Sequence, residues 1–149
     1  MIAVIQRVKS SSVKVEDKIV GQIGKGLNIL LGVKKGDSKE DILKLVNKIV
    51  NLRIFQDEND KMNLSLLDVG GEALIISQFT LAGNIKKGRR PSFDASEDPK
   101  IANEYYEEFK ALVENQGVKV QSGVFGAYMD VSIQNDGPVT FIVDSKELN

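Results

Sequence analysis

Hydrophobic and polar residues alternate along much of this chain. Alternation with a period of two predicts strands with one buried face. We expect such strands at residues 1–8, 13–20, 51–55, 118–121, 128–133 and 139–143. Residues 13–20 flank a polar turn, which predicts a hairpin, and the apolar run at 26–33 predicts a central strand. The dominant pattern is that of a β-rich chain.

Two stretches instead have the apolar spacing of an amphipathic helix. In the first, Ser38 is a candidate N-cap with Asp41 three residues later. In the second, Asp98 and Pro99 form a candidate cap and first turn, and Gly117 ends the pattern. The apolar stripes are Ile42, Leu45, Val46, Ile49 and Val50, and then Ala102, Tyr105, Tyr106, Phe109, Leu112 and Val113. We interpret both stripes as core and expect one α+β domain spanning residues 1–149.

The stretch 73–81 begins as an apolar, β-branched run, as in a strand buried on both faces, and then becomes polar. Ser77, Gln78 and Thr80 end it, with Phe79 between them. A buried hydroxyl or amide without a partner costs about 1–3 kcal/mol. These side chains therefore either pair with neighbouring backbone or line a ligand site, and the sequence leaves both alternatives open.

The densest basic cluster in the chain follows this strand end. It consists of Lys86, Lys87, Arg89 and Arg90 around a flexible glycine. Such a loop can bind phosphates, or it can be an ordinary solvated surface loop. Its position directly after the polar strand end favours a functional role.

Residues 135–138 (Asn-Asp-Gly-Pro) join the last two predicted strands. Pro138 cannot donate to a strand ladder, and Gly137 before it relaxes the steric limits on the residue that precedes a proline. The joint is therefore a candidate for a cis peptide bond or an exposed backbone corner. A plain hairpin turn is the alternative.

The composition restricts the chemistry by what it lacks. The chain has no Cys, no His and no Trp. Thiolate nucleophiles, Ser–His couples and the usual transition-metal ligands are therefore absent, and we expect neither a metal nor a cofactor. The net charge is −1, so a nucleic-acid partner would need a local basic patch, and we expect no DNA partner. No apolar run approaches the roughly 20 residues that span a bilayer, and we expect a cytoplasmic protein.

Two short motifs carry a family resemblance. Residues 77–81 (Ser-Gln-Phe-Thr-Leu) and 135–140 (Asn-Asp-Gly-Pro-Val-Thr) resemble the paired signature of the D-aminoacyl-tRNA deacylases. Residues 5–8 and 90–93 are similar to that family as well, and the resemblance covers the chain from Met1 to about Val143. It implies a homodimer with a barrel-like core of antiparallel or mixed β-sheet and flanking helices. It also implies hydrolysis of D-amino acids from the terminal adenosine of tRNA, with glycine mischarged on tRNA-Ala as a further substrate.

The resemblance implies an active site shared between subunits. Gly137 and Pro138 of one subunit would enter the pocket of the other, hold the substrate ammonium and exclude an L side chain. The substrate-binding set would be Gly137, Pro138, Asn135, Met129, Phe125 and Ala127. We expect the catalytic set to be Ser77, Gln78, Phe79 and Thr80. Because the net charge is −1, we also expect RNA binding to depend on a few local cations, and the basic loop 86–90 is the candidate contact for the acceptor 3′ end of tRNA.

Two nucleophiles are compatible with this site. Thr80 Oγ could attack the ester, but no general base is evident beside it, and an unassisted hydroxyl is a poor nucleophile at neutral pH. Water activated by the 2′-hydroxyl of the substrate is the alternative. We favour water, because it suits a chain without His or Cys. The backbone N–H groups near Phe79 and Thr80 would then bind the developing oxyanion.

Two other classes of function remain open. The chain could be a non-catalytic RNA-binding or interaction module, in which Ser77, Gln78 and Thr80 only satisfy one another. It could also be an aminoacyl esterase without chiral preference.

Overall fold

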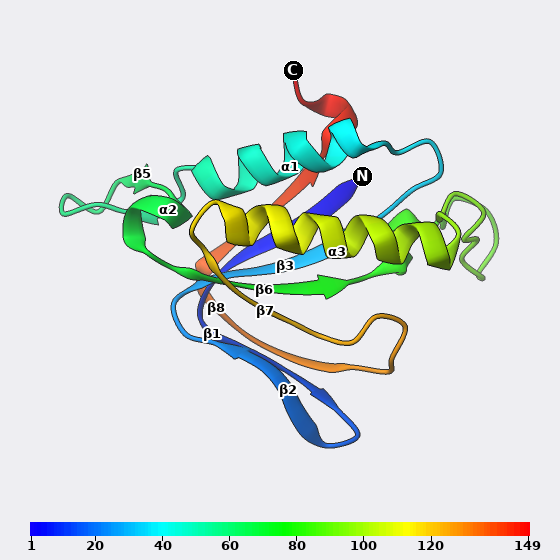
Figure 1. Cartoon of the computed structure of the whole chain (residues 1–149), viewed down its shortest axis with the longest axis horizontal. Helices are drawn as coiled ribbons and strands as arrows, with labels where there is room; N and C mark the ends of the chain where they lie inside the picture. The colour runs from blue at the N-terminus through cyan, green and yellow to red at the C-terminus, as the bar shows by residue number, and fades with distance from the viewer.

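The fold is a strongly curved, mixed β-sheet with two long helices on one face (Figure 1). The computed structural model describes all residues, 1–149. The strands are β1 (Ile2–Val15), β2 (Lys18–Ile23), β3 (Gly26–Gly32), β4 (Phe55–Gln56), β5 (Met62–Leu64), β6 (Glu72–Ser77), β7 (Lys119–Ser122) and β8 (Asp130–Asp144). The helices are α1 (Lys39–Asn51), α2 (Leu66–Val69) and α3 (Pro99–Asn115), with short 3-10 turns η1 (Phe79–Ala82) and η2 (Ser145–Glu147).

The sheet almost closes on itself. Its strand order is β2-β1-β3-β6-β7, and β8 pairs with β1. Strands β2, β3 and β8 run antiparallel to β1, whereas β3, β6 and β7 run parallel to one another. The two ends of this order approach each other, because a Cβ built on Gly21 of β2 would lie 2.7 Å from the Ser122 carbonyl oxygen of β7. The expected barrel-like α+β fold is therefore confirmed.

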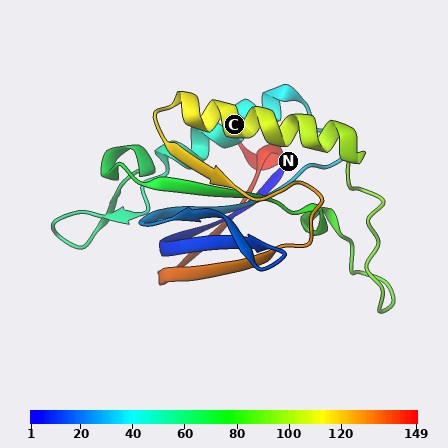
Figure 2. The ribbon, with the colours of Figure 1, turned by 60° about the horizontal axis from the view of Figure 1, so that its bottom comes forward.

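Strand β6 is buried on both faces, as its apolar run predicts. Ala73 and Ile75 belong to the main core of 23 buried residues, which lies between the sheet and helices α1 and α3. Leu74 and Ile76 belong to a smaller core of five buried residues on the other face. Figure 2 shows both helices over one face of the sheet, with β1, β2 and β8 curling beneath it. The strand that leads to the polar stretch is therefore fixed from both sides.

Both long helices begin at their predicted caps. The Ser38 N–H donates to Asp41 Oδ2 at 2.8 Å, and the Lys100 N–H donates to Asp98 Oδ1 at 3.0 Å. The stripe of α1 is fully buried, and in α3 Tyr106, Phe109 and Val113 are buried. None of the helices has the length and apolar composition needed to cross a membrane.

Asp41 connects α1 to the C-terminal turn. Its carboxylate accepts hydrogen bonds from Lys146 Nζ at 2.9 Å and Ser145 Oγ at 2.8 Å. Burial alone would raise the pKa of Asp41, but the hydrogen bonds from Lys146, Ser38 and Ser145 outweigh it and hold the pKa well below its usual range. The carboxylate therefore stays ionised, and η2 stays attached to α1.

The division of residues 128–143 into two separate strands is wrong, and so is the alternative of a hairpin turn between them. Residues 130–144 form a single strand, and residues 135–138 are part of it rather than a hairpin turn. The register shows why: β1 pairs with both halves of β8 in the same direction, from Lys14↔Asp130 to Ile2↔Asp144. The chain does not reverse, and residues 136–139 instead bulge out opposite Arg7, between the pairs Gln6↔Thr140 and Val8↔Asn135.

The short strand predicted at 51–55 is also largely wrong. Helix α1 continues to Asn51, and only Phe55 and Gln56 form β4, which pairs with β5. The apolar stripe of the helix ends at Val50. The alternating residues 51–55 that follow therefore include the last helical residue, Asn51, and an irregular segment before β4. The hairpin predicted at 13–20 is confirmed, with Glu16 and Asp17 at positive φ in its turn.

Candidate functional site

A cavity of about 720 Å³ opens where β3 and β6 end. Parallel strands expose their carboxyl ends at the same edge of a sheet, which is a common location for ligand sites. Leu31 and Val33 at the end of β3 and Ile76 at the end of β6 form part of its apolar wall. The polar end of β6, the start of α3 and the chain around the start of β8 supply most of the remainder. The predicted polar strand end is therefore part of a cavity of ligand size.

Within one chain, the cavity brings together residues of the predicted catalytic set and residues of the predicted substrate-binding set. The predicted residues that line it are Ser77, Gln78, Phe79, Thr80, Phe125, Ala127 and Met129. The other predicted residues are not among its lining: Asn135, Gly137, Pro138, Lys86, Lys87, Arg89 and Arg90. A single chain thus contains the proposed catalytic set next to part of the proposed substrate-binding set.

The strand end has a defined hydrogen-bond geometry. The Gln78 N–H donates to the Leu31 carbonyl at 2.8 Å, which extends the pairing of β6 with β3 by one residue. The Gln78 amide nitrogen Nε2 donates to Thr80 Oγ1 at 3.0 Å. The chain then enters η1, and the N–H groups of Phe79 and Thr80 donate to no group of the chain. Two free backbone donors and a polarised hydroxyl therefore lie at the cavity.

Helix α3 is fixed to β6 close to this strand end. The Tyr106 hydroxyl donates to the Ile75 carbonyl at 2.7 Å. Burial raises the pKa of Tyr106 to about 12, so the hydroxyl remains protonated and keeps this bond across the physiological pH range. The cavity wall formed by α3 is thereby held in register with the polar residues of β6.

Ten of the seventeen lining residues were not predicted as site residues, and four of them lie at the start of α3 or just before it: Ser96, Glu97, Pro99 and Ala102. The predicted cap at Asp98 places the start of a helix here, but nothing local indicates that this start packs over β6. Glu97 is the only charged residue of the lining, and its Oε1 accepts the Asp98 N–H at 2.8 Å. No group of three or more carboxylates lies close enough together to hold a metal ion.

Residues 136–139 form a backbone corner with an exposed tip at Gly137 and Pro138. The Gly137-Pro138 peptide bond is cis, as the sequence suggested, and both residues are exposed. Asn135 supports the corner from one side: its Oδ1 accepts the Val139 N–H at 2.8 Å, and its Nδ2 donates to Thr140 Oγ1 at 2.9 Å. The role of Asn135 visible within one chain is therefore to shape this corner.

Arg7 supports the corner from the other side, although the sequence did not mark it as a site residue. Its guanidinium is almost fully buried; Nε donates to the Asp136 carbonyl at 3.0 Å, and Nη1 donates to the Ile54 carbonyl at 2.8 Å. Nε also lies 3.6 Å from Asp136 Oδ2. A lone cation in an alternating strand looks solvent-exposed, and only the bulge in the neighbouring strand reveals its partners.

The basic residues lie on a separate, exposed loop. The loop is closed at its base by two backbone hydrogen bonds between Asn84 and Ser92, of 2.7 and 2.9 Å. It projects from the body of the protein near the start of α3 (Figure 2). Lys86, Lys87, Arg89 and Arg90 form no ion pair within the chain. Their charges are therefore free to meet an external anion.

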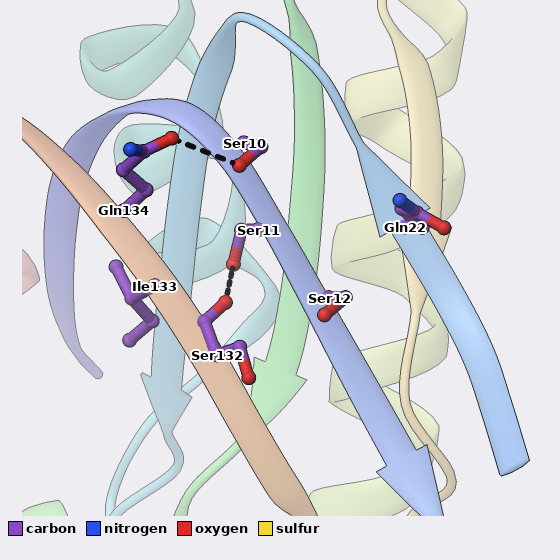
Figure 3. A pocket seen from close by; sticks show the side chains of 7 residues that line it. All are labelled: Ser10, Ser11, Ser12, Gln22, Ser132, Ile133 and Gln134. Atoms are coloured by element: carbon purple, nitrogen blue, oxygen red, sulfur yellow. Dashed lines mark hydrogen bonds between the residues drawn. The ribbon is translucent and has the colours of Figure 1, made fainter.

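A second hollow, of about 330 Å³, lies on β1, β2 and β8 (Figure 3). It is lined by Ser10, Ser11, Ser12, Gln22, Ser132, Ile133 and Gln134. Ser11 Oγ donates to the Ser132 carbonyl at 2.9 Å, and Ser10 Oγ donates to Gln134 Oε1 at 3.3 Å. None of the predicted site residues lies here, and Ser10 and Ser11 already bond across the strands.

The fold and cavity define a class: a barrel-like α+β protein with a hydroxyl-and-amide site at a strand end. Comparison with known proteins then gives the family. The family model described as D-Tyr-tRNA(Tyr) deacylase matches residues 4–144, so the chain belongs to that family. Proteins named D-aminoacyl-tRNA deacylase from Persephonella marina and Aquifex aeolicus are 64% and 60% identical over 148 residues, covering 99% of this chain and 100% of theirs.

Solved structures agree on the fold. A structure titled c-Myc DNA Unwinding Element Binding Protein is 38% identical, with a TM-score of 0.91, and covers 97% of this chain and 98% of its own. A probable eukaryotic D-amino acid tRNA deacylase is 21% identical, with a TM-score of 0.82, over 95% of this chain and 97% of its own. The second likeness concerns the fold alone.

The geometry of the corner predicts a stability effect. Arg7→Met removes two hydrogen bonds and leaves the carbonyls of Asp136 and Ile54 without a donor. We expect a loss of about 2–4 kcal/mol in the free energy of unfolding, measured by urea denaturation. Gln6→Ala is the control, because its side chain makes only a 3.4 Å surface contact, and it should change stability by less than about 0.5 kcal/mol. Equal costs for both variants would contradict the role of Arg7.

Proposed function

We propose that this protein hydrolyses the ester bond between a D-amino acid and the terminal adenosine of tRNA, releasing free D-amino acid and tRNA. Glycine mischarged on tRNA-Ala is a further proposed substrate. Membership of the deacylase family and the names of its relatives support this activity. The observation that carries it is the polar end of β6, where free N–H groups, an amide and hydroxyls line a cavity whose only charged side chain is that of Glu97.

The proposed chemistry relies on stabilising the oxyanion. An aminoacyl ester is already activated, so the protein needs to position it and to stabilise charge in the transition state. The free N–H groups of Phe79 and Thr80 would bind the developing oxyanion, where one donor can change the rate by about 10²–10³. Gln78 would position the ester or the adenosine, and Ser77 would complete the polar wall.

Water is the proposed nucleophile. Thr80 Oγ1 accepts a hydrogen bond from Gln78 and donates none to a carboxylate or other basic group of the chain. Nucleophilic hydroxyls in enzymes need such a base. The 2′-hydroxyl of the substrate would instead orient and activate the water, which requires an RNA end rather than a DNA end.

We further propose a homodimer in which the corner of one subunit closes the cavity of the other. In the single chain Gly137 and Pro138 are exposed and lie outside the cavity lining. Large apolar side chains are also exposed around the corner and the cavity, with Tyr128 at 96%, Ile142 at 72% and Phe141 at 41%. Exposed apolar side chains that gather near a cavity are typical of a protein interface, and we interpret these three in that way. The carbonyls of the corner would then hold the substrate ammonium and leave no room for an L side chain.

The loop 86–90 is the proposed contact for the acceptor end of tRNA. Its four cations are exposed and unpaired, whereas the net charge of the whole chain is −1. Binding would therefore depend on this local patch and not on a global field. We propose that the protein acts in the cytoplasm, where aminoacyl-tRNA is used.

The first prediction from the proposed function concerns the chirality of the substrate. The wild type should hydrolyse D-Tyr-tRNA much faster than L-Tyr-tRNA, and Gly137→Ala should reduce this ratio by about tenfold or more. A Cβ on Gly137 would lie 2.7 Å from Val139 Cγ2 and 3.2 Å from Arg7 Nη2, at a φ of +140° that L residues rarely adopt. The corner must therefore move. The measurement is the initial rate of deacylation of both substrates.

Gly36→Ala is the matched control, because Gly36 also has a positive φ but a Cβ added there would have no atom within 4 Å. It should keep the wild-type ratio. Full discrimination by Gly137→Ala would contradict the role of the corner. Equal wild-type rates on both substrates would indicate an esterase without chiral preference, and no hydrolysis of either would indicate a non-catalytic module.

The second prediction separates the two nucleophiles. Thr80→Ala should keep most of the wild-type rate, whereas a substrate ending in 2′-deoxyadenosine should react at least about 100-fold more slowly. Single-turnover rates on D-Tyr-tRNA measure both effects. A dead Thr80→Ala variant together with a reactive 2′-deoxy substrate would show that Thr80 is the nucleophile.

The third prediction concerns the basic loop. Replacing its four cations by Gln should weaken tRNA binding and make its salt dependence shallower, by about 0.7 in the log–log slope for each lost single-strand phosphate contact. Titrations at several salt concentrations measure this slope. The control replaces four other exposed lysines: Lys14, Lys18, Lys48 and Lys61. Unchanged affinity in the loop variant would exclude this loop as the tRNA contact.

A further inference from the structure

Two phenylalanine rings are exposed together at the rim of the cavity. Phe79 lines the cavity and is 57% exposed, and Phe93 is 37% exposed. Their ring centroids are 5.0 Å apart, with an interplanar angle of 63°. The proposed chemistry uses only the backbone N–H of Phe79 and assigns no role to Phe93. An exposed aromatic pair beside a ligand cavity is therefore left without a partner.

The pair is held in place by the backbone beneath it. A Cβ built on Gly83 would lie 3.0 Å from Phe93 Cε1, so the ring rests directly on this glycine. The Gly83 N–H donates to the Thr80 carbonyl at 2.9 Å, which closes η1 behind Phe79. The two bonds between Asn84 and Ser92 fix the residue just before Phe93. The orientation of the rings is thus set before any ligand binds.

The charges next to the pair indicate the chemistry of the ligand. Phe93 directly follows the loop whose Lys86, Lys87, Arg89 and Arg90 are unpaired. Aromatic faces beside a cationic track are the combination that binds single-stranded nucleic acid, because bases stack on the rings while phosphates meet the cations. A protein partner or the side chain of an amino acid would use the rings but would not need the adjacent positive charge.

We propose that Phe79 and Phe93 form a stacking platform for a nucleobase of the unpaired 3′ end of tRNA. The loop cations would hold the phosphates of the same nucleotides. The inference rests on the proposed function and adds a base-recognition surface to its catalytic cavity. In this arrangement the base would lie at the rim of the cavity, and the ester would lie inside it, next to the N–H groups of Phe79 and Thr80.

A double-mutant cycle between the base and the ring tests the platform. The probes are two unacylated RNA minihelices with a CCA 3′ end, one complete and one with an abasic terminal ribose. Loss of the base should weaken wild-type binding by about tenfold, within the range of base–aromatic stacking. Phe93→Leu should weaken binding of the complete probe by a similar factor, and it should bind both probes equally. Dissociation constants from fluorescence anisotropy give the coupling.

Two variants control for structure and for apolar contact. Phe93→Tyr keeps an aromatic face and should retain the preference for the complete probe. Ile85→Ala removes the most exposed apolar side chain of the same loop, at 81% exposure, and should leave the preference unchanged. Thermal unfolding of each variant shows whether it remains folded.

Several results would overturn the inference. They are an equal loss of affinity for both probes in Phe93→Leu, no loss for either probe, or a change in self-association without any coupling to the base. The last result would mean that a second copy of the chain covers the rings. Because the probes carry no ester, this test is independent of the deacylation assay. Hydrolysis of D-Tyr-tRNA without coupling between base and ring would support the proposed function and contradict the stacking platform.

Discussion

The buried guanidinium of Arg7 is the interaction on which the geometry of the candidate site depends. It donates to the Asp136 carbonyl within the bulge of β8 and to the Ile54 carbonyl after α1. A buried cation is costly unless its donors are satisfied, so the surrounding backbone must keep these acceptors in place. The bulge is therefore held against β1, and the Gly137-Pro138 corner projects outward as a rigid feature instead of an adaptable loop.

The cavity depends on a different constraint, the burial of β6 on both faces. Residues 73–76 are fixed by two cores, and Tyr106 ties the strand to α3 by one hydrogen bond. The polar residues that follow are therefore presented at a fixed position. The lining of the cavity has no His, Cys or Lys, and its one charged side chain is that of Glu97. In the proposed chemistry, catalysis there comes from positioning and from backbone donors.

The sequence predicts those parts of the structure that have a local cause. The helical stripes, their caps at Ser38 and Asp98, and the polar end of β6 all follow from residue spacing, and the structure confirms them. The continuity of β8 could not be predicted, because Asn-Asp-Gly-Pro has the composition of a turn and only pairing with a long β1 keeps the strand in one direction. Arg7, Ser96 and Glu97 depend in the same way on contacts between distant segments, so no local pattern marks them.

The corner and the cavity are joined by one proposal: each subunit would supply the backbone that closes its partner's site. A crystal structure of the protein in its solution oligomeric state tests this proposal most directly. We predict that residues 137 and 138 of one copy lie against residues 77–80 of another. A structure in which this corner is far from every copy of that strand end would contradict it.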